Sequence, residues 1–120
     1  AVLPASYVRS DVVHNIGAVS FLMAAFMYNK PEYLKVGLDD HVHVPYRLGL
    51  IPGSEEVIRS SVKAGAYGAT ISGSGPTIIA FSPSDKAHLV GESMVSTFKH
   101  HGITSSYIVL DFDQSGISAV

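Results

Sequence analysis

The chain contains no cysteine among its 120 residues. Disulfide bonds and thiolate metal sites are therefore excluded, while the redox compartment stays open and a reducing cytoplasm is compatible. Basic residues are also few, since 8 Lys and Arg stand against 10 Asp and Glu for a formal net charge of −2. Because no polybasic patch is expected, the composition argues against nucleic acid or an anionic membrane surface as a partner.

Long hydrophobic runs are absent as well. The most apolar stretch, near the N-terminus, is interrupted by Asp11, His14, Asn15 and Ser20. It therefore falls short of the roughly 20 apolar residues that a membrane-spanning helix needs. No basic start followed by an apolar run marks a signal peptide. These absences predict a soluble domain with no membrane partner, and we expect it in the cytoplasm.

The length suits one domain. Hydrophobic residues make up 47% of the 120 residues, enough to make a self-sufficient core plausible. A chain of this length is expected to have a radius of gyration of about 13–14 Å.

Hydrophobic periodicity predicts a long first helix of about six turns, capped by Ser6 and ending near Asn29. Its predicted inward face consists of Val8, Val12, Ile16, Val19, Met23 and Phe26, and its predicted solvated face carries Arg9, Ser10, Asp11 and Ser20. Two short helices are predicted next, from Pro31 through Lys35 and from Leu38 or Asp39 to about Arg47. A longer helix is predicted from Ser54 to Gly65, with Val57, Ile58 and Val62 inward. The last helix is predicted from Ser82–Asp85 to Gly102, with Ala87, Val90, Met94 and Phe98 inward.

Runs rich in β-branched and aromatic residues predict a hairpin of residues 67–71 and 77–81. The segment 106–112 reads as a strong further strand, and 116–120 could form an edge strand. Together with the helices, these elements predict an α+β fold in two layers, an antiparallel sheet with helices on one face.

The loop of the hairpin, Ser72-Gly73-Ser74-Gly75-Pro76, has more glycine than a minimal turn needs. Glycine lets backbone N–H groups approach an anion closely, so the loop could bind or contact phosphate. A tight turn is the commoner explanation of a bare Gly-Ser-Gly sequence. The loop is neither a P-loop nor a dinucleotide motif, because no Lys-Ser/Thr follows it and it leads into a strand.

The run from Gly68 to Thr77 resembles the third signature of the GHMP kinase superfamily. Residues 40–47, followed by Leu50-Ile-Pro52, resemble a segment that the homoserine kinase branch carries between two helices. Leu3-Pro4 and the following helix with Asp11, Val12 and Asn15 are also similar to that branch. The resemblance covers nearly the whole chain.

The resemblance implies a ferredoxin-like C-terminal domain, spanning residues 1–120, of an enzyme that phosphorylates L-homoserine with ATP in threonine biosynthesis. In such kinases ATP and Mg²⁺ are held mainly by an N-terminal domain with a Pro-x-x-x-Gly-Leu-Gly-Ser-Ser-Ala loop, which does not occur in these 120 residues. The N-terminal domain is thus an implied partner, and the chain alone is expected to be inactive. An apolar surface left exposed where that domain sits would permit a homodimer.

Substrate binding is implied for Arg47, whose guanidinium suits a carboxylate. Without the resemblance, a surface arginine paired with Asp39 or Asp40 is the commoner case. Asn15 is a second candidate for substrate binding, with a solvent-facing helix residue as the alternative. The loop residues Ser72, Gly73, Ser74 and Gly75 are expected to support the phosphate loop of the N-terminal domain.

Metal ligands and a catalytic base are not assigned. His41 and His43 would lie on one face of a strand but about 200° apart on a helix, and no third ligand has convincing spacing. Carboxylates are present, but no pattern places two of them together. Two alternatives remain open: another GHMP kinase, such as a mevalonate-type or diphosphocytidyl-methylerythritol enzyme, and a stand-alone ferredoxin-like module that binds a small molecule or another chain.

Overall fold

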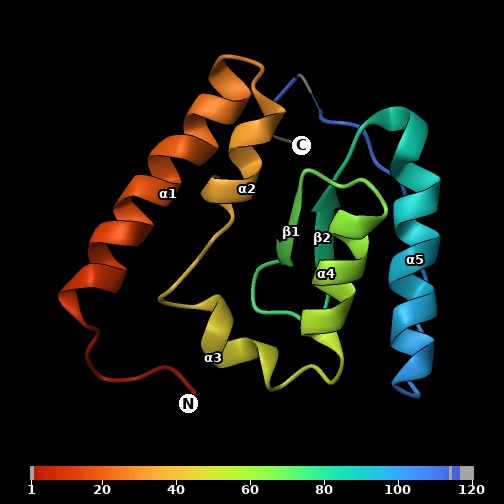
Figure 1. The fold of residues 1–120 in the computed structure, drawn as a ribbon, viewed down its shortest axis with the longest axis horizontal. Coiled ribbons are helices and arrows are strands. Elements are labelled where there is room, and N and C mark those ends of the chain that lie inside the picture. The colour runs from red at the N-terminus through yellow and green to blue at the C-terminus, as the bar shows by residue number, and fades with distance from the viewer. Residues whose placement is uncertain (1, 114, 117–120) are drawn as a thin grey trace.

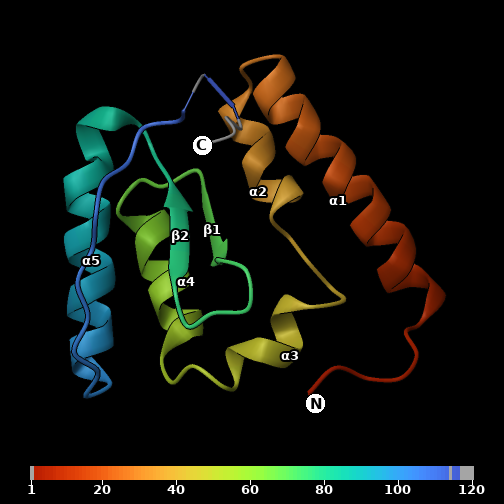
Figure 2. The same cartoon turned by 180° about the vertical axis from the view of Figure 1, so that it is seen from behind.

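A computed structural model gives the fold, and the structure describes residues 2–113, 115 and 116. Its elements are α1 (Arg9–Met27), the 3-10 turn η1 (Pro31–Tyr33), α2 (Leu34–Gly37), α3 (Val44–Leu48), α4 (Ser54–Lys63), β1 (Gly68–Ile71), β2 (Ile78–Phe81), the 3-10 turn η2 (Ser84–Lys86) and α5 (Ala87–His100). In Figures 1 and 2, α1 lies beside α2, the hairpin β1–β2 is central, α4 covers one face of the hairpin, and α5 lies beside α4. The predicted edge strand at 116–120 falls almost wholly outside the described residues.

The predicted hairpin is confirmed. Strands β1 and β2 are antiparallel, and Gly68 lies opposite Phe81 while Ile71 lies opposite Ile78. Within the described part of the chain the sheet has these two strands. The predicted α+β class, with helices against an antiparallel sheet, is therefore confirmed, and the sheet is small.

The predicted strand at 106–112 is wrong, because the described residues of this segment form no ladder. The segment follows α5 instead (Figure 2), and the ring of Tyr107 packs against Gly91 of that helix. Ile108 and Leu110 are 78% and 77% exposed. Their residue types favour a strand, but a strand needs a neighbour with which to exchange hydrogen bonds.

The predicted inward face of α1 is also wrong. Val12 and Ile16, for example, are 41% and 66% exposed, whereas Ala18 and Ala25 are buried. The backbones of α1 and α2 come close, since a Cβ at Gly37 would lie 2.7 Å from the backbone of Leu22, and the buried positions of α1 are the small residues Ala18 and Ala25. Nor does Ser6 cap the helix, which begins at Arg9 after Val8.

Helix α1 is long and apolar enough to cross a membrane, judged by length and composition alone. It has 19 residues and a mean hydropathy of 1.3, with 11% of the tested window buried. The expectation that its polar interruptions would prevent this is therefore wrong. Core helices of soluble proteins and signal sequences pass the same test, so the finding alone does not place the chain in a membrane.

The helix predicted to reach Arg47 from Leu38 or Asp39 is shorter in the structure, where α3 begins only at Val44. The preceding residues turn around the carboxylate of Asp40, which accepts hydrogen bonds from the backbone N–H groups of Val42, His43 and Val44. A side chain that satisfies the backbone in this way competes with helical hydrogen bonding. The segment before α3 is therefore a capped turn.

The best-packed part of the fold lies between α4, α5 and the hairpin. Val57 of α4 is completely buried, and Val90 of α5 is 3% exposed, as predicted for both, although Val62 is 44% exposed. The rings of Phe26, Phe81 and Phe112 also meet, with centroids 5.5–6.0 Å apart. The radius of gyration, 15.1 Å, exceeds the expected value because much apolar surface on α1 and after α5 remains outside this core.

Candidate functional site

The glycine loop closes on itself through two backbone hydrogen bonds. The N–H of Ser72 donates to the carbonyl of Thr77 over 2.8 Å, and the N–H of Gly75 donates to the carbonyl of Ser72 over 3.0 Å. Gly73 and Gly75 have φ values of 57° and 79°, a region that L residues with a Cβ adopt at a cost. Within the described residues, this leaves the N–H groups of Gly73 and Ser74 without a protein acceptor. The loop can thus offer two backbone donors to an anion, fewer than a complete phosphate cradle.

Arg47 lies against this loop. Its Nη1 donates a hydrogen bond to the carbonyl oxygen of Ser74 over 2.9 Å, across 27 positions of sequence. It forms no ion pair with Asp39 or Asp40 in the structure. Its Nε is buried and has no acceptor among the described residues. The structure therefore joins two of the predicted site elements and leaves donor capacity on the guanidinium.

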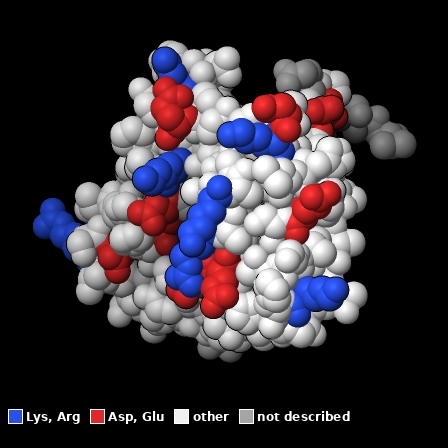
Figure 3. Space-filling view, turned by 45° about the vertical axis from the view of Figure 1, so that its right-hand side comes forward, with Lys and Arg blue, Asp and Glu red and all other residues white. Residues whose placement is uncertain are grey.

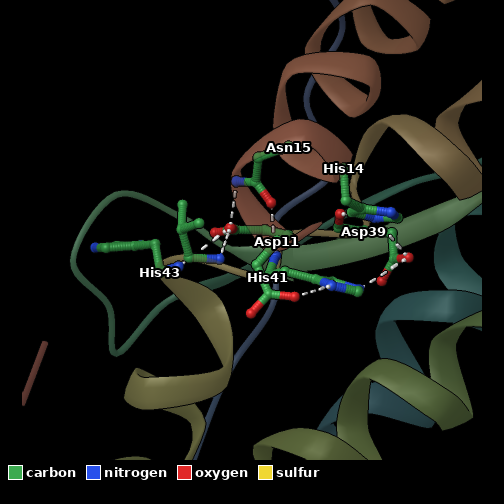
Figure 4. A network of polar contacts seen from close by, with 8 residues as sticks. Asp11, His14, Asn15, Asp39, His41 and His43 are labelled. Carbon is green, nitrogen blue, oxygen red and sulfur yellow. Dashed lines mark hydrogen bonds and ion pairs between the residues drawn. The ribbon is translucent and has the colours of Figure 1, made fainter. Parts of the chain in front are cut away.

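Asn15 is half-buried rather than solvent-facing, and it connects α1 to the turn before α3 (Figure 4). Its Nδ2 donates to Oδ1 of Asp40 over 2.7 Å, and its Oδ1 accepts from the backbone N–H of His41 over 2.7 Å. Because the backbone N–H of His41 can only donate, the oxygen of the Asn15 side-chain amide must face it. Since Nδ2 carries two hydrogens, one of them remains for a ligand.

Asp40 is the residue on which this turn depends. Partial burial by itself raises the pKa of its carboxyl group, but hydrogen bonds from Asn15 and from the N–H groups of Val42, Val44 and His43 together outweigh burial and lower the pKa. From sequence, the only contact predicted for Asp40 was an ion pair with Arg47. Asp40 precedes Pro45, and Pro45 lies in the first turn of α3. An aspartate followed shortly by a proline is a sequence signal for the start of a helix.

Helix α3 connects the two groups of contacts. Asp40 stabilises the turn that leads into it, and Arg47 lies in its last turn. The position of Arg47 relative to the glycine loop thus depends on how the turn around Asp40 is held. Asn15 contributes to that position from α1, although no hydrogen bond joins it to Arg47 in the described residues.

His41 also lies near α1, where its ring stacks on that of His14 with centroids 3.8 Å apart. His43, the other histidine considered from sequence, is not part of this cluster. Instead, Asp39 supplies the third side chain. Sequence spacing missed the group because His14 comes from a helix 25 residues away in the chain.

A groove of about 470 Å³ borders the same turn. It lies between the segment 35–48 on one side and α4 with β1 on the other, and its lining includes Lys35, Asp39, Asp40, His41, Pro45, Glu55, Ile58, Tyr67 and Thr70. Neither Arg47 nor the glycine loop lines it. The groove and the loop are therefore separate features of the surface.

Acidic and basic side chains are interspersed on the face shown in Figure 3, without a patch of one sign. On α4, Glu55 pairs with Arg59 over 3.8 Å. Glu56 accepts a hydrogen bond from His101 over 2.9 Å, and this contact lowers the pKa of the Glu56 carboxyl group. These carboxylates make exposed contacts on the surface of α4 and lie outside the contacts of Arg47 with the loop.

Comparisons with known proteins agree on one family. The family model described as "GHMP kinases C terminal" matches residues 23–100. A homoserine kinase of Carboxydothermus hydrogenoformans is 44% identical over 115 residues, which cover 96% of this chain and 37% of that protein. A homoserine kinase of Desulfitobacterium hafniense is 38% identical over 119 residues, or 99% of this chain and 40% of that protein.

The fold agrees as well. A crystal structure of homoserine kinase from Cytophaga hutchinsonii superposes with a TM-score of 0.78 at 34% identity, covering 82% of this chain and 32% of that chain. The chain thus spans about two-fifths of the length of the curated relatives it matches.

Proposed function

The chain belongs to the family of GHMP kinase C-terminal domains, and we propose from this membership that it serves as the C-terminal domain of a homoserine kinase. The complete enzyme transfers the γ-phosphoryl group of ATP to the side-chain hydroxyl of L-homoserine and so forms O-phospho-L-homoserine, a step of threonine biosynthesis. The relatives named homoserine kinase support the substrate. The main structural support for the proposal is the hydrogen bond between Arg47 and Ser74. It connects the arginine that is expected to bind the substrate with the glycine loop of the GHMP kinase signature.

Arg47 orients the carboxylate of homoserine in this proposal. A guanidinium binds a carboxylate through two parallel N–H donors, and Arg47 has donors left after its bond to Ser74. Asn15 contributes through its remaining amide hydrogen and by holding the turn at Asp40. Phosphoryl transfer depends mainly on positioning and on stabilisation of charge, so fixing the substrate is a direct contribution to rate.

The glycine loop supports the phosphate-binding loop of the N-terminal domain. Its residues Ser72, Gly73, Ser74 and Gly75 include no lysine, and two of its N–H groups are used within the loop. A loop of this kind fits ATP as a supplementary contact rather than as the main phosphate site. ATP and Mg²⁺ are accordingly held mainly by the N-terminal domain, and the isolated chain has no kinase activity.

The exposed apolar side of α1 contacts the N-terminal domain of the same enzyme. Asp11, His14 and Asn15 on the other side of α1 bond to the turn at residues 39–41, and such polar groups are costly inside a bilayer. A protein partner therefore explains α1 better than a membrane does, and a second copy of the chain is the competing partner. We place the complete enzyme in the cytoplasm, with no nucleic acid among its partners.

The test compares the chain alone, the longer protein, and the chain mixed with the separate N-terminal domain. Binding of L-homoserine and MgATP is measured by isothermal titration, and phosphorylation is measured with mevalonate as the control substrate. We expect phosphorylation of homoserine by the longer protein and by the mixture but not by the chain alone. Tight ligand binding by the chain alone, unchanged by the added domain, would support a stand-alone module instead. Preference for another alcohol would indicate a different GHMP kinase.

A further inference from the structure

We propose that His14, Asp39 and His41 form a binding site for Zn²⁺ or a divalent ion of similar coordination chemistry. One ligand atom from each of the three side chains can be chosen so that all of them lie within 4.8 Å of one another. His14 comes from α1, whereas Asp39 and His41 come from the turn before α3 (Figure 4). The proposal concerns metal binding and does not depend on kinase activity.

The distances within the cluster match those of a small tetrahedral site. Nε2 of His14 lies 3.1 Å from Oδ2 of Asp39, and Nε2 of His41 lies 3.5 Å from the same oxygen. Ligand atoms at the usual 2.0–2.1 Å from tetrahedral zinc are about 3.3–3.4 Å apart. The separations of 3.1 and 3.5 Å in the structure lie on either side of this value, so an ion fits beside Asp39 without a large backbone movement.

A carboxylate also lies on the far side of the His41 ring. Nδ1 of His41 is 3.4 Å from Oδ1 of Asp11. When Nδ1 donates its hydrogen to that carboxylate, Nε2 is left with the lone pair that faces Asp39. Histidines that bind metals commonly have such a carboxylate at the second ring nitrogen, where it fixes the tautomer and the orientation of the ring.

The two imidazole rings are stacked, with an angle of 17° between their planes. They must turn apart for both Nε2 atoms to point at one ion. The side chains of His14 and His41 are 33% and 41% exposed, which leaves them room to turn. Binding would then fix α1 to the same turn that Asn15 and Asp40 already connect.

The donor set determines the kind of ion. Two imidazole nitrogens and one carboxylate oxygen suit Zn²⁺ and its neighbours, whereas Mg²⁺ and Ca²⁺ prefer oxygen ligands throughout. Three protein ligands leave a fourth position for water or an anion. Without an ion, the same side chains make exposed polar contacts, and contacts of this kind contribute little to stability even when both partners are charged.

The test is a titration of the untagged protein with Co²⁺ at neutral pH, followed by displacement with Zn²⁺. We expect the visible absorption of tetrahedral Co²⁺ and one ion per chain. His14→Gln and His41→Gln should each weaken Zn²⁺ binding by about 100-fold or more, and Asp11→Asn by about 10-fold, since loss of an outer partner costs roughly 10–100-fold. His43→Gln is the matched control and should bind as tightly as the unmodified protein.

Circular dichroism without metal shows whether each variant is folded. Should His14→Gln unfold, Asp39→Asn decides the question, because the Asp39 side chain is 56% exposed and its replacement leaves packing intact. Absence of saturable Co²⁺ binding, or equal Zn²⁺ affinity in folded ligand variants and unmodified protein, would overturn the proposal. An equal loss in His43→Gln would do so as well.

Discussion

The guanidinium of Arg47 donates a hydrogen bond to the carbonyl oxygen of Ser74 over 2.9 Å. This contact brings the last turn of α3 to the tip of the β1–β2 loop, although 27 residues separate the two in sequence. The arginine therefore sets the position of the loop as well as offering charge to a ligand.

Arg47→Lys in the longer protein should raise the KM for homoserine. A lysine keeps the positive charge but lacks the planar guanidinium, whose several N–H donors can bind the carbonyl of Ser74 and a carboxylate at the same time. Charge-assisted hydrogen bonds contribute about 1.5–3 kcal/mol, so we expect a loss of roughly 10- to 100-fold in kcat/KM, measured by steady-state kinetics. Arg59→Lys, at an exposed i,i+4 pair with Glu55, is the control and should leave both constants unchanged. A purely structural Arg47 would instead lower the urea midpoint and leave the KM as it was.

Two substitutions in the glycine loop should differ in stability. Both glycines have positive φ, but a Cβ at Gly73 meets no atom within 4 Å, whereas one at Gly75 lies 2.9 Å from Cδ1 of Ile51 and 3.3 Å from Cγ2 of Ile71. Gly73→Ala should cost about 1–2 kcal/mol from its backbone conformation alone. Gly75→Ala should cost more, because buried Ile51 must also move. Urea unfolding of both variants gives the order, and equal losses would contradict it.

Gly37 and Gly17 provide a matched pair for the packing of α1 on α2. A Cβ at Gly37 would lie 2.7 Å from the N and Cα atoms of Leu22, whereas a Cβ at Gly17 meets nothing within 4 Å. Gly37→Ala should therefore destabilise the fold by about 1–3 kcal/mol through overpacking. Gly17→Ala, in the interior of α1, should stabilise it by about 0.5–1 kcal/mol. Thermal unfolding measures both, and a stable Gly37→Ala variant would show that α1 does not pack this closely.

Asp40 should make stability depend on acid pH. A carboxyl group whose pKa is lower in the folded state stabilises the fold at pH values above its ordinary pKa, about 3.9. That contribution is lost as the pH falls through the lowered pKa of the folded protein. The urea midpoint of the unmodified protein should therefore drop more steeply below about pH 4 than that of Asp40→Asn.

Asp85→Asn is the control for this pH series, since Asp85 is an exposed residue at the start of η2. It should follow the unmodified protein closely. If Asp40→Asn did so too, the pKa of Asp40 would not be lowered in the folded protein.

Local patterns in the sequence determined much of this protein. The hairpin follows from two β-rich runs around a glycine loop, and the helices α4 and α5 follow from apolar spacing and breaker residues. The ten-residue signature from Gly68 to Thr77 indicates the family, and the same resemblance identified Arg47 as a candidate for substrate binding. These features depend on neighbours in the chain, so they are readable without a structure.

The tertiary structure decided which surfaces and side chains meet. Periodicity located α1 but not its inward face, because the side that packs is set by the small residues facing α2 and by partners for Asp11, His14 and Asn15. The strand-like segment 106–112 follows α5 instead, since pairing needs an edge beside it. Residues 25 or more positions apart created the contacts of Asn15 with Asp40, of Arg47 with Ser74, and of His14 with Asp39. Such contacts depend on how the elements pack against one another, and spacing within one segment carries no information about them.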